Sequence, residues 1–73
     1  MVQTEEIRQR IRILMNFFNA KRYDEVITKV KPLLKKNPRE VIFHNLLALS
    51  LQGKGKTHEG IEILNNALNI FPN

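Results

Sequence analysis

The sequence predicts an all-α fold of two tandem helix-turn-helix hairpins, and three observations support this prediction. Apolar and turn residues recur after 34 positions, so that Ile27 matches Ile61 and Pro38 matches Pro72. Within each half, apolar residues follow the spacing of amphipathic helices, and Gly or Pro residues separate these segments. A period of this length is typical of an array of helical hairpins. Residues 1–73 are therefore expected to form a single domain.

The first predicted helix covers about residues 5–19. Thr4 precedes two acidic residues, which indicates an N-cap followed by charges that oppose the positive end of the helix dipole. The apolar residues of this segment span an arc of roughly 200°, about twice what one packed face needs. They are Ile7, Ile11, Ile13, Leu14, Met15, Phe17 and Phe18. The helix therefore carries more apolar surface than one neighbour can cover.

The second predicted helix opens at Asp24 or at the Lys21–Arg22 turn and ends near Lys35 and Lys36. Cations at that end oppose the negative end of the dipole. One apolar stripe and one basic side predict a surface helix. Pro32 lies inside the segment, where it removes a backbone donor and costs about 3 kcal/mol if the helix stays straight. A kink is expected there.

The third predicted helix starts at Asn37–Glu40, which combines an Asn cap, a Pro at the first helical position and a Glu three residues after the cap. The helix is expected to reach about Gln52. Its apolar residues surround nearly the whole circumference, and they are Val41, Ile42, Phe43, Leu46, Leu47, Ala48, Leu49 and Leu51. Such a helix suits the centre of the array, between the other elements.

The fourth predicted helix follows a break at residues 53–56, with Thr57 as its cap. Its apolar residues cover roughly half of its circumference, but only the two preceding helices are available to pack on them. Ile63, Ile70 and Phe71 are therefore expected to be buried against a second chain. An isologous dimer is the simplest closed arrangement, and a repeat-on-repeat stack or an exchange of hairpins are the alternatives.

These patterns together resemble the tetratricopeptide repeat family, with one repeat at residues 7–40 and another at 41–73. In the second repeat, the residues that match the family consensus are Leu47-Ala48, Leu51, Gly55, Gly60-Ile61, Leu64, Ala67-Leu68 and Pro72. In the first, Tyr23–Ile27 matches the start of the family's second helix and Pro38 its closing proline. The resemblance implies a fragment of a right-handed α-α superhelix. It names a scaffold and not an activity.

The same resemblance implies a partner-binding groove on the concave side, lined by the first helix of each repeat. Ile13, Leu14 and Phe17 would face the partner helix of the hairpin. The groove would be lined by Ile11, Met15, Phe18, Ile42, Asn45 and Leu49. Chaperone-binding members hold a carboxylate there with Lys, Asn and Arg, whereas this chain offers only Asn45 as a polar group. The expected partner is an apolar peptide or the face of an amphipathic helix; the alternative is that these side chains simply complete the core.

Charge and composition narrow the class of protein. Residues 1–38 hold nine Lys/Arg against four Asp/Glu, and residues 39–73 hold three against three. The sequence disfavours nucleic-acid binding, because the solvent-exposed helix faces carry no aromatic side chains for base stacking. The basic row that could bind a nucleic acid is Lys29, Lys31, Lys35, Lys36 and Arg39. The longest apolar run, residues 46–49, is far short of a membrane span. A cytoplasmic protein that does not enter the membrane is expected.

No motif indicates catalysis, a cofactor or a metal. Gly55-Lys56-Thr57 ends like a phosphate-binding loop, but Ser50 stands where that motif needs Gly. His58–Glu62 lacks the second His of a zinc site, and the chain has no Cys. The principal prediction is a protein-binding scaffold that is not an enzyme. The alternative is an N-terminal or excised repeat segment of a larger bacterial enzyme, without activity of its own, because residues 43–49 resemble repeats found ahead of glycosyltransferase and sulfotransferase domains.

Overall fold

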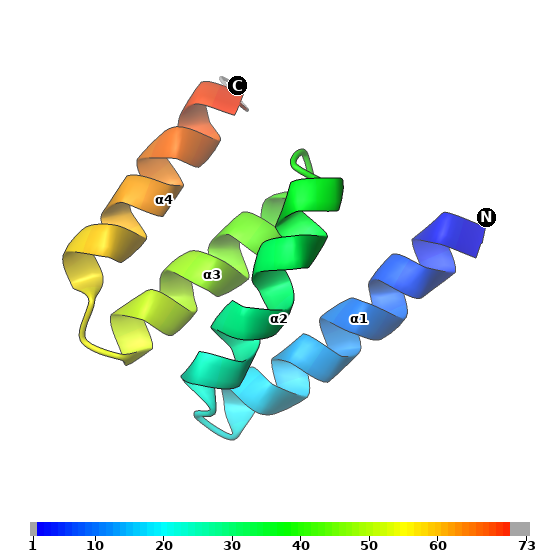
Figure 1. Cartoon of the computed structure of the whole chain (residues 1–73), viewed down its shortest axis with the longest axis horizontal. Coiled ribbons are helices and arrows are strands. Elements are labelled where there is room, and N and C mark those ends of the chain that lie inside the picture. Colours follow the sequence, from blue (N-terminus) through cyan, green and yellow to red (C-terminus); the bar gives the residue numbers. More distant parts are fainter. Residues whose placement is uncertain (1, 71–73) are drawn as a thin grey trace.

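The computed structural model describes residues 2–70, which form four helices in two consecutive antiparallel hairpins (Figure 1). The helices are α1 (Val2–Asn19), α2 (Tyr23–Lys36), α3 (Val41–Gly53) and α4 (Thr57–Ile70). The described residues contain no strand. The predicted all-α fold of two helical hairpins is confirmed. The turn between α3 and α4 is the predicted one, and Gly55 adopts a φ of 85° there.

The start of α1 differs from the prediction. Thr4 lies inside α1, which begins at Val2, so the prediction of Thr4 as the N-cap is wrong. Residues 2 and 3 include neither Gly nor Pro, and nothing local stops the helix from extending upstream of Thr4.

The connection between α2 and α3 also differs from the prediction. α3 begins at Val41, and Glu40 precedes it in an extended conformation without a side-chain cap. Asn37 serves the preceding helix instead, because its backbone N–H and its side-chain Nδ2 donate to the carbonyl oxygen of Leu33 at 2.9 and 3.0 Å. The predicted capping box over residues 37–40 is therefore wrong. The last carbonyl groups of α2 and the first N–H groups of α3 all lack partners within their own helix. Asn37 donates to one of these carbonyls and does not cap α3.

Helix α2 runs without interruption from Tyr23 through Pro32 to Lys36, close to the predicted bounds. The kink at Pro32 stays a prediction. The first turn of α2 is linked to the end of α3 by an ion pair between Asp24 and Lys54. Exposed pairs of this kind contribute at most about 1 kcal/mol, so packing and not charge holds these ends together.

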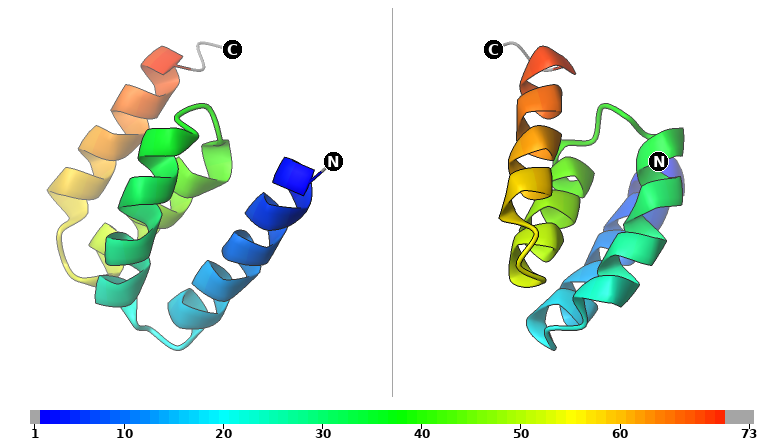
Figure 2. Two further views of the ribbon diagram at one scale, coloured as in Figure 1. Left: turned by 45° about the vertical axis from the view of Figure 1, so that its right-hand side comes forward. Right: turned by 60° about the vertical axis from the view of Figure 1, so that its left-hand side comes forward.

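The core lies where α3 meets α1 and α2. Its fully buried apolar side chains are Leu14 from α1, Val26 and Val30 from α2, and Phe43, Leu46 and Leu47 from α3. Within residues 2–70, α3 contacts each of the other three helices, whereas α4 contacts α3 alone. The central position predicted for α3 is confirmed. Figure 2 shows α4 at one edge of the molecule and α1 at the other.

Candidate functional site

The six predicted groove residues lie on two helices that contact each other. Helix α1 supplies Ile11, Met15 and Phe18, and α3 supplies Ile42, Asn45 and Leu49. Each set recurs at three- or four-residue intervals, so each forms one stripe along its helix. We call these six residues the α1/α3 surface.

The side chains of the α1/α3 surface differ in solvent exposure. Ile11, Phe18 and Ile42 are half-buried and pack against the core. Met15 and Leu49 are 37% and 45% exposed. These two residues are 34 positions apart, so the same position of each repeat presents an exposed apolar side chain. The ring of Phe18 packs edge-on against Tyr23 at a centroid distance of 5.5 Å, which fixes one wall.

A second concave feature was not predicted from the sequence. It is a hollow of about 750 Å³ between α1 and α2, which we call the α1/α2 hollow. Its apolar lining comes from Ile7, Ile13, Leu14, Pro32 and Leu33, and its polar lining from Glu6, Arg10, Thr28, Lys29, Lys36 and Asn37. Because the hollow depends on the spacing of two helices, no local sequence pattern could have revealed it.

Ile13 is less covered than the other two residues that were expected to face the hairpin partner. Of the three residues expected to face α2, Leu14 is fully buried and Phe17 is half-buried, whereas Ile13 is 50% exposed. Ile13 borders the α1/α2 hollow. Ile13 therefore lies toward α2, but the hollow leaves half of its side chain uncovered.

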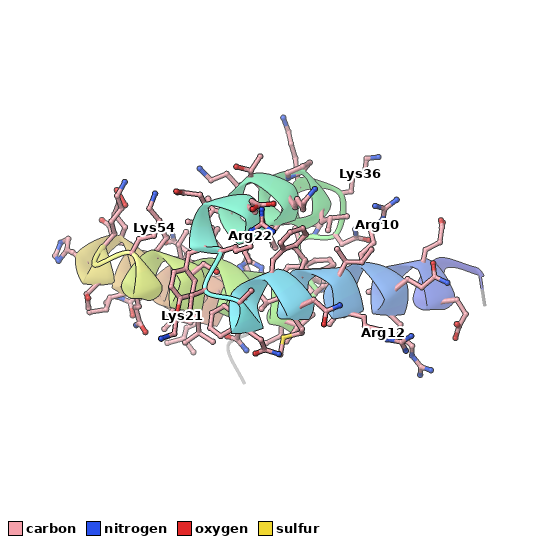
Figure 3. All side chains as sticks on the ribbon, turned by 90° about the horizontal axis from the view of Figure 1, so that it is seen from below. Arg10, Arg12, Lys21, Arg22, Lys36 and Lys54 are labelled. Atoms are coloured by element: carbon pink, nitrogen blue, oxygen red, sulfur yellow. The ribbon has the colours of Figure 1, made fainter. Side chains whose placement is uncertain are left out.

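The basic side chains do not form one continuous surface. Figure 3 shows Arg10 and Lys36 on one side of the molecule and Arg12 and Lys21 on the other. Two further cations are held by an aromatic ring, because Arg22 Cζ and Lys29 Nζ lie 5.3 and 5.4 Å from the centre of the Phe17 ring. Such contacts stabilise the hairpin by cation–π attraction. The charges are thus divided among several directions.

The predicted self-association residues of α4 lie in different surroundings. Ile63 packs against the chain's own core, and Ile70 is half-buried. Phe71 lies outside the described residues. The exposed apolar side chains of α4 are instead Ile61 and Leu68, at 46% and 65%. Their spacing of seven residues, two helical turns, is the sequence signal that could have identified this pair.

The buried histidine of α3 has a structural role. His44 is buried, and its Nε2 lies 2.7 Å from the carbonyl oxygen of Pro38, to which it donates. Across residues 2–70, no three His, Cys, Asp or Glu side chains gather closely enough to hold a metal ion. None of the helices in this range is both long and apolar enough to cross a membrane.

Comparisons with known proteins give no assignment. No family model matches the chain, and searches of curated proteins and of solved structures also find no match. The surfaces described above are therefore the basis for a functional proposal.

Proposed function

We propose that this chain is a noncatalytic protein-interaction module of two tetratricopeptide-type repeats, and that its α1/α3 surface binds an apolar peptide or helix face. The observation that carries the proposal is the pair Met15 and Leu49, exposed at equivalent positions of neighbouring helices. Solvent-exposed apolar side chains at matching positions of a repeat array provide regularly spaced contacts for an extended or helical ligand.

The composition of the α1/α3 surface favours an apolar ligand over a charged one. All its members are apolar except Asn45, which is half-buried and can exchange hydrogen bonds with a ligand backbone. Met15 has an unbranched, polarisable side chain that adapts to ligands of different shape. We place this activity in the cytoplasm, where a small domain without cysteines folds under reducing conditions.

The expected contribution of each exposed residue is modest. Full burial of a Met or Leu side chain contributes about 1.5–3 kcal/mol, and because Met15 and Leu49 are already partly covered, each retains roughly half of that amount for binding. Placing a carboxylate at either position would instead require burial of an unpaired charge. A Met15→Glu variant should therefore bind at least tenfold more weakly, since tenfold corresponds to about 1.4 kcal/mol.

The test begins with selection of peptides from a random library against the immobilised 73-residue chain. Selected peptides should carry apolar residues at helical or alternating spacing, and one of them then serves as the probe. Met15→Glu and Leu49→Glu should each weaken its binding, measured by fluorescence anisotropy, while Asn66→Glu adds the same charge at an exposed position of α4 and should not.

Circular dichroism separates a binding role from a core role. If Met15→Glu and Leu49→Glu retain the helical spectrum and melting temperature of the unmodified chain, the loss of binding is local. A large fall in melting temperature would identify both side chains as core residues instead, because core truncation costs about 2–5 kcal/mol. Selection of peptides without apolar residues would also contradict the proposal.

A further inference from the structure

The exposed apolar residues of α4 correspond to covered residues of α2. Ile61 and Leu68 lie 34 positions after Ile27 and Leu34, which are half-buried and pack against the core. Helix α2 contacts both α1 and α3, whereas in the described part of the chain α4 contacts only α3. The exposure of Ile61 and Leu68 therefore marks a face of α4 on which the repeat pattern places a further helix.

Helix α1, at the other edge of the molecule, also has an exposed apolar residue at a position that is buried in the second repeat. Ile13 lies 34 positions before Leu47, which is only 4% exposed and belongs to the core cluster together with Val26 and Val30 of α2. Helix α1 contacts α2 and α3 and leaves Ile13 50% exposed. Among the described residues, no helix packs on α4 as α3 packs on α2, and no helix packs on α1 as α2 packs on α3.

The charges around these two faces are opposite. Helix α4 contains Glu59 and Glu62 and no Lys or Arg. Ile13 lies between Arg10 and Arg12 around the circumference of α1, at about 100° per residue, and Figure 3 shows these two arginines on opposite sides of the helix. Lys29 and Lys36 add positive charge across the α1/α2 hollow, against Glu6 alone.

We infer that a second copy of this chain covers α4: Ile61 and Leu68 of one copy pack against α1 of the next, at Ile13 and the basic edge of the α1/α2 hollow. The contact joins α4 to α1 between copies in the way that α2 joins α3 within one copy. It is therefore head-to-tail, and it repeats until a ring closes or a filament grows.

Charge decides between this contact and a symmetric pairing of two α4 helices. A symmetric pair through Ile61 and Leu68 would bring Glu62 of both copies to the edge of the same interface without a Lys or Arg from either helix. The head-to-tail contact brings Glu62, next to Ile61, toward Arg10 or Arg12. Attraction between opposite charges favours the head-to-tail arrangement and makes it weaker at high salt.

Two single substitutions separate these arrangements. Ile13→Gln alters only the α1 face, and Leu68→Gln alters only the α4 face; both positions are at least half exposed, and Gln keeps a good helix propensity without adding a charge. In the head-to-tail arrangement each variant alone should associate at least tenfold more weakly than the unmodified chain. An equimolar mixture should recover association, because the α4 of the Ile13→Gln copy and the α1 of the Leu68→Gln copy are both intact.

Sedimentation equilibrium measures these outcomes. The unmodified chain should exceed twice 8.6 kDa as its concentration rises, the separate variants should remain near 8.6 kDa, and the mixture should stop at twice that mass. An unmodified chain that stays monomeric, an Ile13→Gln variant that associates normally, or a mixture that stays monomeric would each overturn the inference. Circular dichroism checks folding, and Arg12→Glu, at an exposed site, supplies a second variant of the α1 face.

The α1/α3 surface is not part of this contact. Met15→Gln should therefore retain association while it weakens binding of the selected peptide. If the chain does not self-associate but still binds the selected peptide, the proposed function is unaffected. If it self-associates but no peptide binds, only the proposed function is refuted.

Discussion

Replacing Gly60 with Ala tests how closely α4 must approach α3. Gly60 is the buried residue of α4, and an added Cβ would lie 2.8 Å from the carbonyl oxygen of Ala48 and 3.1 Å from Cγ of Gln52. The Gln52 side chain can rotate away. The Ala48 oxygen belongs to the backbone of α3, and ordinary contact begins at 3.4 Å, so the helices must separate by about 0.6 Å (3.4 − 2.8).

Two opposing effects determine the size of the change. Ala stabilises a helix by about 1 kcal/mol relative to Gly. Overpacking of a close contact costs about 1–3 kcal/mol, and among the described helices α4 contacts only α3. The expected net result is a loss of about 1 kcal/mol, which lowers the melting temperature of a domain this small by about 4–8 °C.

Thermal unfolding followed by far-ultraviolet circular dichroism measures this change. Asn66→Ala is the matched control, because Asn66 is exposed on the same helix and the substitution improves helix propensity without a new contact. Its melting temperature should rise. A Gly60→Ala variant that melts at or above the unmodified chain would refute the argument that the approach of α4 to α3 requires Gly at this position.

Three further predictions concern other parts of the chain. Ser50 is fully buried, and its Oγ has no hydrogen-bond partner among the described residues, so Ser50→Ala should raise stability by about 1 kcal/mol in urea unfolding; a loss of stability would reveal a hydrogen bond made by the hydroxyl. Gly55 has open space around its Cβ position but a φ of 85°, so Gly55→Ala should lower stability by about 1 kcal/mol and Gly55→Asn by less; equal effects would contradict the backbone explanation. Labelled RNA or DNA should show no mobility shift with this chain at low salt; binding that falls steeply as salt rises would instead establish the basic row as a nucleic-acid site.

The number, order and approximate bounds of the helices follow from local patterns. Apolar periodicity and turn residues act over a few positions, so the bounds of α2 and the turn at Gly55 could be predicted. The central position of α3 could also be predicted, because apolar residues around its whole circumference require neighbours on every side.

The capping of individual helix ends was less predictable. Asn37 stands between two helices, and its side chain can accept from a backbone N–H of the following helix or donate to a carbonyl of the preceding one. The structure uses the second option, with Leu33 as the acceptor. The sequence pattern is the same for both options, because they involve the same residue and differ only in the path of the backbone at 37–40.

The exposure of the proposed interaction surfaces depended on tertiary structure. Ile27 and Ile61 are matching positions of one repeat pattern, as are Leu34 and Leu68, so the sequence alone determined that all four are apolar positions of amphipathic helices. Only the packing decided that α3 lies beside the first member of each pair, while the second remains exposed. A helical period specifies which side chains share a face, whereas burial of that face depends on which distant segment packs against it.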